Sequence, residues 1–224
     1  MYMRILVLAV LVFSLTAFAQ VPTPPTDVPA VPAASNIGYQ GDWYQIKYMA
    51  NLGSGDSVLN LTNTGRQNGL DPAGRICVNV YTFDPNEELI SCCACPVTPN
   101  GLKSLSARSD LINNTLTPGV PSGITVKLVA DQKFAPGTLN LICNASTPTA
   151  ASLARGMRAW GTTIHALPTT PVTFGVTETE FSMAELSVSE LNKVTGYCAF
   201  IQNNGSGFGI CNSCRAGGLG ATAK

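Results

Sequence analysis

Histidine is nearly missing from this sequence, in which His165 is the single one among 224 residues. Zinc enzymes of the three-histidine type need three imidazole ligands, so the count excludes that class of catalysis. A Ser-His-Asp triad needs only one histidine, but the G-x-S-x-G motif that presents the serine of many hydrolases is also missing. His165 lies in a predicted strand, and we interpret it as a structural or surface residue.

Charge is scarce as well. Charged residues make up 12% of the sequence, with 13 basic and 13 acidic side chains and a formal net charge of 0. Nucleic-acid-binding proteins carry a basic stripe or patch, which this sequence lacks, so that class is excluded. A surface with so few charges is typical of secreted β-rich modules and of subunits that bury surface against each other.

Long apolar runs are limited to the first nineteen residues. Arg4 is followed by an apolar stretch and by Ala17-Phe18-Ala19, which fits the small-x-small cleavage rule of a signal peptide. No later stretch approaches the roughly 18 residues needed to span a bilayer. We therefore expect residues 1–19 to be a signal peptide, no membrane span after cleavage, and a secreted, periplasmic or cell-surface protein.

The mature chain divides into three predicted parts. Residues 20–37 form a proline-rich leader or tether, with five prolines between residues 21 and 36. Residues 38–216 form one disulfide-rich domain, and residues 217–224 form a flexible tail. The leader acts either as a simple flexible segment, as a spacer from a surface, or as an arm around residues 21–50 that docks on a neighbouring molecule.

Strand-like segments recur about every ten residues, separated by Gly, Pro and Asn. The predicted strands are residues 42–49, 57–65, 76–83, 87–97, 123–130, 137–146, 157–167 and 172–181. Asp84-Pro85-Asn86 favours a tight turn, so residues 76–97 are predicted to form a hairpin. The pattern predicts a mainly β fold, an antiparallel β-sandwich of immunoglobulin-like or jelly-roll-like type.

One α-helix is predicted near the C-terminus, at about residues 187–203. Ser187 and Glu190 have the spacing of a capping box. Leu191, Val194, Cys198 and Ile201 then recur at helical spacing, and Asn204-Gly205 can end the helix.

Eight cysteines, an even number, are predicted to form disulfides in an exported chain. They are Cys77, Cys92, Cys93, Cys95, Cys143, Cys198, Cys211 and Cys214. Side chains alternate along a strand, so Cys93 and Cys95 should face one way and Cys92 the other. We predict that Cys77 bonds Cys93 or Cys95 across the hairpin, and that Cys92 reaches another element such as the Cys143 strand.

Five cysteines precede the helix and three belong to the helix region, so complete internal pairing requires at least one bond between the two groups. Two alternatives use the same residues. The Cys92, Cys93 and Cys95 cluster with Cys211 and Cys214 could form a four-thiolate zinc site, and Cys211-x-x-Cys214 could be a redox centre. Export to an oxidising compartment favours disulfides, and we expect no metal and no cofactor.

Two further groups of residues are candidates for a site. Glu178 and Glu180 share one face of a strand and could supply the paired carboxylates of a glycosidase. Trp43, Tyr44 and Trp160 could line a sugar-binding face, although such aromatic residues more often pack in a core.

The stretch CVNVYTFDPNEELISCCACPVTPNGL, residues 77–102, resembles a set of uncharacterised secreted proteins predicted in bacteria. The shared phrase is YxFDxxEELxxCCxCPVTPNG, with a weaker likeness over residues 157–168 and the C-terminal cysteines. The resemblance implies bacterial export and no particular activity. The phrase LTNTG, residues 61–65, is similar to phrases in bacterial immunoglobulin-like surface modules.

Taken together, the sequence favours a non-enzymatic structural or interaction module of the bacterial cell envelope or extracellular space. Its expected partners are further copies of itself or other envelope proteins. A carbohydrate-binding module is the first alternative, with glycans as ligands. A secreted hydrolase using His165 or the pair Glu178 and Glu180 is the second.

Overall fold

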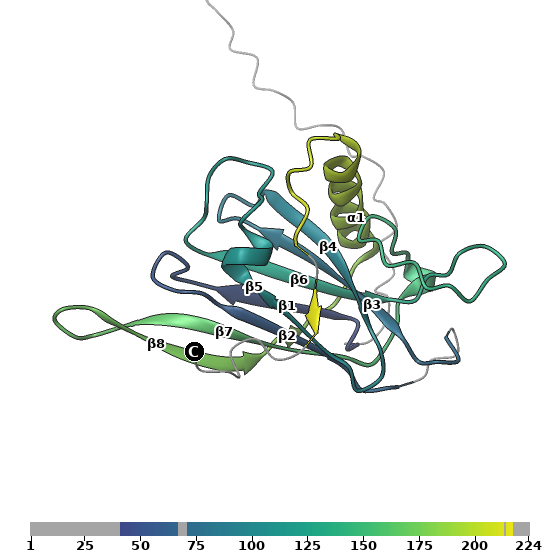
Figure 1. Ribbon diagram of the computed structural model, residues 1–224, viewed down its shortest axis with the longest axis horizontal. Coiled ribbons are helices and arrows are strands. Elements are labelled where there is room, and N and C mark those ends of the chain that lie inside the picture. Colours follow the sequence, from purple (N-terminus) through teal and green to yellow (C-terminus); the bar gives the residue numbers. More distant parts are fainter. Residues whose placement is uncertain (1–40, 67–70, 213, 217–224) are drawn as a thin grey trace, which may run out of the picture. The chain divides into compact units, whose positions relative to one another are not determined.

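The computed structural model describes residues 41–66, 71–212 and 214–216. The predicted signal peptide, the leader and the tail lie outside the described residues. Within these residues, ten strands, two short helical turns and one α-helix follow one another (Figure 1). Their bounds are β1 Tyr44–Met49, β2 Val58–Asn63, β3 Ile76–Phe83, β4 Leu89–Val97, β5 Leu102–Ser106, η1 Ala107–Leu111, β6 Ile124–Asp131, η2 Ala150–Ser152, β7 Met157–Leu167, β8 Thr173–Glu180, β9 Ser182–Met183, α1 Val188–Asn203 and β10 Arg215–Ala216.

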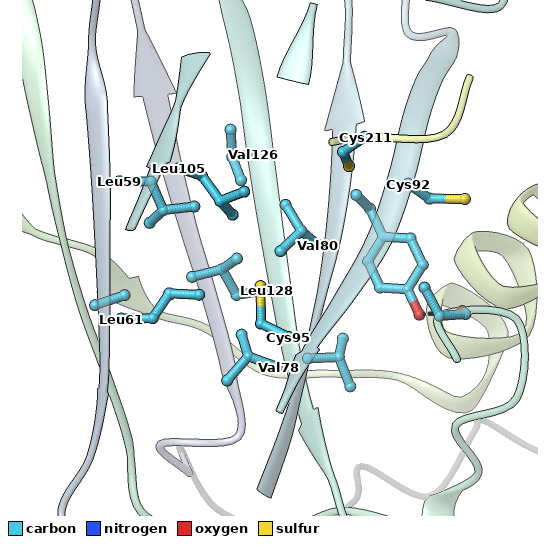
Figure 2. Close-up of a cluster of buried hydrophobic side chains, with 14 of the residues drawn as sticks. Leu59, Leu61, Val78, Val80, Cys92, Cys95, Leu105, Val126, Leu128 and Cys211 are labelled. Atoms are coloured by element: carbon cyan, nitrogen blue, oxygen red, sulfur yellow. Dashed lines mark hydrogen bonds between the residues drawn. The ribbon is translucent and has the colours of Figure 1, made fainter. Parts of the chain in front are cut away.

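The strands form two five-stranded antiparallel sheets, which confirms the predicted sandwich. Sheet A has the order β4-β3-β6-β1-β9, and sheet B has the order β10-β5-β2-β7-β8. Figure 2 shows the core between them, where Val78, Val80 and Leu128 of sheet A face Leu59 and Leu105 of sheet B. All five side chains are buried. Apolar burial of this kind is the main force that holds two sheets together.

The other face of sheet A is covered by α1 and by the loop around Cys143. Tyr81 of β3 donates its hydroxyl hydrogen to the Ala145 carbonyl at 2.6 Å, and Lys127 of β6 forms an ion pair with Glu190 of α1. Because β3 is covered on both sides, seven of its eight residues are buried. This explains why its sequence, ICVNVYTF, is almost continuously apolar.

Helix α1 begins and ends as predicted. The Ser187 side chain accepts a hydrogen bond from the Glu190 amide at 3.1 Å and caps the first turn. Gly205 follows the helix with φ +70°, a conformation that favours glycine. The helix buries Leu191, Val194 and Ile201. Within the described residues, no helix combines the length and the apolar character needed to cross a membrane.

The predicted strand at residues 137–146 is wrong, because this segment is a loop with only an isolated bridge at Leu141. Gly137 adopts φ +69°, and the Asn144 side chain accepts the Ser146 amide at 3.0 Å in a tight turn. Such local side-chain hydrogen bonds compete with a strand ladder. In addition, β5 forms where no strand was predicted.

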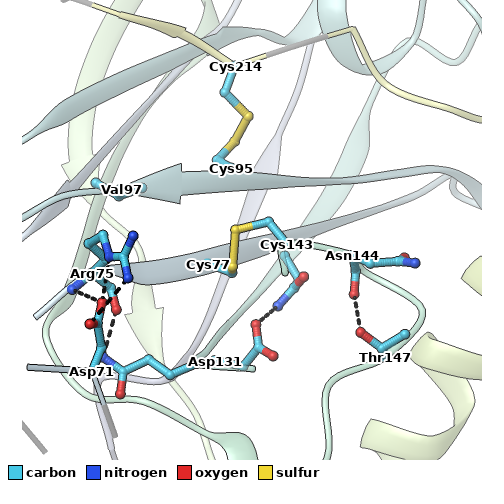
Figure 3. Close-up of a disulfide and its surroundings, with 12 residues drawn as sticks. Asp71, Arg75, Cys77, Cys95, Val97, Asp131, Cys143, Asn144, Thr147 and Cys214 are labelled. Atoms are coloured by element: carbon cyan, nitrogen blue, oxygen red, sulfur yellow. Dashed lines mark hydrogen bonds and ion pairs between the residues drawn. A yellow bond between two sulfur atoms is a disulfide. The ribbon is translucent and has the colours of Figure 1, made fainter. Parts of the chain in front are cut away.

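All eight cysteines form disulfides, and Figure 3 shows two of these bonds. The pairs, with their Cα–Cα distances, are Cys77–Cys143 (5.2 Å), Cys92–Cys198 (5.9 Å), Cys93–Cys211 (5.3 Å) and Cys95–Cys214 (5.6 Å). Three bonds therefore join the C-terminal region to the sheets, which confirms the parity argument. The opposite orientations predicted for Cys92 and its two neighbours are also confirmed.

The predicted pairing of Cys77 within the hairpin is wrong, and a β-bulge is the reason. Phe83 faces Leu89, a register that would place Cys77 opposite Cys95 if it continued, but Thr82 faces Ser91. The bulge shifts every later pair by one residue, so Cys77 faces Pro96 and turns to the opposite side of the sheet from Cys93 and Cys95. Cys77 then meets Cys143 in the covering loop, and Cys92 bonds α1 rather than Cys143.

Candidate functional site

The strand β4 connects three separate parts of the molecule through its cysteines. Cys92 holds α1 against one face of sheet A, while Cys93 and Cys95 hold Cys211 and Cys214 on the other. The Cys92 amide also donates to the Gly209 carbonyl at 2.8 Å, so the C-terminal segment runs directly beside this strand. The surfaces around β4 and α1 are therefore fixed in position.

The disulfides leave no thiolate for the alternative zinc or redox centres. The described part of the chain also contains no group of three or more His, Cys, Asp or Glu residues that could hold a metal ion. The surface depressions are the remaining candidates for a site.

An apolar groove runs along α1. Its volume is about 550 Å³, and we call it the α1 groove. It is lined by Glu87, Glu88, Leu89, Leu116, Thr117, Tyr197, Phe200 and Ile201. Tyr197 and Phe200 are 50% and 64% exposed, although both are large aromatic side chains. They lie outside the buried stripe of the helix, one residue from the Cys198 disulfide and one from buried Ile201.

A polar pocket of about 330 Å³ adjoins the groove at Glu87 and Tyr197. Lys127 lines this pocket, paired with Glu190 and 4.7 Å from the centroid of the Phe83 ring. The ring face and the carboxylate both stabilise the ammonium group. This pocket therefore carries mixed charges beside the apolar groove.

A third depression, of about 430 Å³, lies at the β3–β4 turn and is lined by Asp84, Asn86 and Val120 among others. The turn forms where Asp84-Pro85-Asn86 predicted it. The Asp84 carboxylate accepts the amides of Asn86 and Glu88, both at 2.9 Å. These bonds fix the turn, whose residues contribute to all three depressions.

A fourth depression, of about 640 Å³, lies at the loop of residues 132–139 and is lined in part by Gln132 and Ser152. Beside it, Asp131 is buried and accepts a hydrogen bond from the Asn79 amide at 2.8 Å (Figure 3). Burial raises the pKa of Asp131 to about 6, while the hydrogen bonds from Asn79 and Ser152 oppose this shift. Asp131 thus lies beneath the surface as part of a buried polar network.

The aromatic residues proposed as a sugar-binding face do not come together. Trp43 and Tyr44 are buried, at 8% and 2% exposure, and belong to the core cluster. Burial, followed by the nearby Glu190 charge, raises the pKa of Tyr44. Trp160 is half-buried in sheet B, on the face that it shares with its neighbours Asn60 and Glu180.

His165 and the two glutamates lie on opposite faces of the β7–β8 hairpin. Glu178 faces Thr162 and Glu180 faces Trp160, whereas His165 faces Gly175. Because faces alternate along a strand, the odd-numbered His165 points away from the side that carries both carboxylates. His165 Nε2 shares a hydrogen bond with Thr177 Oγ1 at 2.7 Å, and Glu178 accepts one from Asn60 at 3.0 Å.

Sequence reasoning missed the aromatic residues that the structure leaves exposed. Tyr197 and Phe200 fall between the buried positions of α1, on the side where a helix packed on a protein surface usually carries polar residues. Two aromatic residues on that side were a signal that the sequence already contained. The contribution of Leu116 carries no such signal, because it comes from a loop.

Comparisons of the chain with protein-family models, with curated proteins and with solved structures found no match. The resemblance of residues 77–102 to uncharacterised secreted proteins stays a prediction.

Proposed function

We infer that this chain is an exported, non-enzymatic structural or interaction module of the bacterial cell envelope or extracellular space. Four disulfides support export, since such bonds persist in oxidising compartments. The observation that carries the interaction role is the α1 groove, an exposed apolar surface on a helix that the Cys92–Cys198 bond fixes in place. Exposed apolar grooves with polar rims are typical of binding sites.

Cell fractionation of a bacterial host tests this proposal. We expect the oxidised protein outside the cytoplasm, with a fraction retained on the envelope. Phe200→Lys places a charge in the groove and should lower the retained fraction several-fold. Leu139→Lys is the matched control, because Leu139 is similarly exposed, at 62%, but lies in the loop of residues 132–139. Reduced protein in the cytoplasm, or equal retention of both variants, would contradict the proposal.

Glycan binding is the second candidate, favoured by the exposed rings of Tyr197 and Phe200 beside the carboxylates of Glu87 and Glu88. Aromatic faces stack on sugars and carboxylates accept their hydroxyl hydrogens. A glycan array separates the two roles. Saturable binding that is lost in Tyr197→Ala and kept in Trp160→Ala would favour a carbohydrate-binding module whose site is the α1 groove.

A further inference from the structure

Among the sheet edges that the described residues form, only that of β8 is both long and open. Sheet A ends at β4, whose edge bonds Gly209 and Cys211 at Cys92 and Leu116 at Ile90, and at β9, which has two residues. Sheet B ends at β10, also of two residues, and at β8, of eight. Short or covered edges prevent unwanted strand pairing. The β8 edge is long, and no described residue covers it.

The exposed side of β8 is apolar and uncharged near the hairpin tip. Figure 1 shows the β7–β8 hairpin projecting beyond the other strands. Val172, Phe174 and Val176 are 60%, 43% and 60% exposed, and they alternate with small or polar residues. Residues 172–177 contain no charge and no proline. Such a segment is well suited to adding another strand.

The backbone of β8 is oriented to accept a partner at these same residues. The Phe181 amide donates to the Ala159 carbonyl at 2.9 Å, in register with the β7–β8 ladder. Hydrogen-bonding direction alternates along an antiparallel strand, so odd-numbered residues of β8 bond to β7. The amides and carbonyls of Phe174 and Val176 therefore point outward, along the free edge.

We propose that β8 pairs antiparallel with β8 of a second copy, around a two-fold axis that passes through Gly175. In this register Phe174 faces Val176 of the other copy, so four apolar side chains meet around the axis, and Val172 faces Glu178 of the other copy at each end of this cluster. Gly175 meets its symmetry mate at a non-hydrogen-bonded position, where two strands approach most closely. The proposal rests on the interaction role proposed above and names its partner.

Repulsion between the carboxylates of two β8 strands favours pairing with the axis at Gly175 over pairing nearer the domain body. With the axis at Gly175, the two copies of Glu178 lie six residues apart along the strand pair, about 20 Å, and screening largely removes their repulsion. An axis nearer the domain body would place the carboxylates of Glu178 and Glu180 against each other. Two β8 strands can therefore pair without carboxylate repulsion only through their uncharged residues near the hairpin tip.

The leader of the chain is a poorer occupant of the edge. Pro22, Pro24, Pro25, Pro29 and Pro32 lack the amide hydrogen that a pairing strand must donate, and they occupy both odd and even positions. Residues 44–49 of the predicted docking arm are also committed elsewhere, because β1 pairs with β6 and β9 of its own sheet. A second copy of β8 has neither restriction.

Sedimentation velocity of the full exported, oxidised protein tests the pairing. A strand pair buries little area, so we expect a monomer–dimer equilibrium with a dissociation constant of roughly 10–100 μM. Val176→Lys and Val176→Pro should each raise this constant at least tenfold. Val176→Pro removes an outward amide while leaving the bonds to β7, and circular dichroism verifies its fold. Phe200→Lys is the control and should leave the dimer unchanged.

Cross-linking tests the register. Gly175→Cys places two thiols on the axis and should give a disulfide-linked dimer in oxidised buffer. Thr177→Cys places them four residues apart and should give none. A monomer at all concentrations, a dimer insensitive to Val176→Lys, or a dimer lost only on deleting residues 20–40 would overturn the proposal. Envelope retention, which tests the α1 groove, is measured independently of dimerisation. The two proposals can therefore fail separately.

Discussion

The β3–β4 and β7–β8 hairpins have the same local architecture and opposite environments. The strands β3 and β8 are both eight residues long and both pair antiparallel with a neighbour in sequence. Seven residues of β3 are buried, whereas seven of β8 are exposed. Three disulfides start from β4 and none from the β7–β8 hairpin. Local strand propensity therefore favours both hairpins, whereas burial decides whether a hairpin belongs to the core or stays exposed and available for binding.

Removing the Cys92–Cys198 bond should cause the largest loss of stability. The double variant Cys92→Ala with Cys198→Ala leaves no free thiol and opens a link between residues 106 positions apart. We expect the free energy of unfolding to fall by about 3–4 kcal/mol, measured by urea denaturation of the oxidised protein. A loss below about 1 kcal/mol would show that packing alone holds α1 on β4.

The buried carboxyl group beside β3 should give the next largest effect, and it depends on pH. The pKa of Asp131 is about 6, above its ordinary value of 3.8, so the folded chain binds this proton more tightly than the unfolded chain. The contribution of Asp131 to stability is therefore complete below about pH 4 and is lost as pH rises to about 6. The loss is on the order of 3 kcal/mol.

Asp131→Asn checks this prediction, because an amide keeps the shape and the bond from Asn79 but cannot ionise. The stability difference between variant and native protein should grow in favour of the variant between pH 4 and pH 6. Glu180→Gln on the exposed β8 is the matched control and should show no such trend. Parallel stability curves for Asp131→Asn and the native protein would contradict the prediction.

Matched valine truncations compare the two hairpins directly. Val80 is buried between the sheets, and Val176 is 60% exposed on β8. Val80→Ala should cost about 2 kcal/mol through lost burial and a small cavity. Val176→Ala should change stability by less than about 0.5 kcal/mol. Chemical denaturation of dilute protein, below the proposed dimerisation range, measures both, and equal losses would remove the distinction between the hairpins.

The helix that covers β3 and β4 gives the smallest expected effect. Ser187→Ala removes the side chain that caps the Glu190 amide and should cost about 1 kcal/mol. Ser187→Asn retains a capping oxygen and should stay near the native stability. If the two variants unfold at the same urea concentration, the cap contributes nothing, and packing, the Lys127–Glu190 ion pair and the Cys92–Cys198 bond position the helix without it.

The sequence was a good guide wherever structure depends on neighbours along the chain. It predicted the bounds of β3 and β7, the turn at Asp84 and the helix cap at Ser187, because alternation, turn residues and capping spacing are local signals. It was a poor guide at residues 137–146, where local hydrogen bonds of Asn144 replaced a strand. The candidate site was not predicted. Tyr197 and Phe200 were visible on the polar side of the helix pattern but were not selected, and Leu116 carries no local signal because it lies in a loop.

By itself, the sequence determined that this is a β-rich chain with a C-terminal helix. It also determined that at least one disulfide must link the C-terminal cysteines to those of the strands. The alternation of apolar residues predicts the strands, and the odd numbers of cysteines before the helix and in the helix region require the link. Only the tertiary structure decided which cysteines pair. One bulge at Thr82 turned Cys77 away from Cys93 and Cys95, because a shift of one residue exchanges the two faces of a strand. The same long-range packing buried Trp43 and left Phe200 and Val176 exposed.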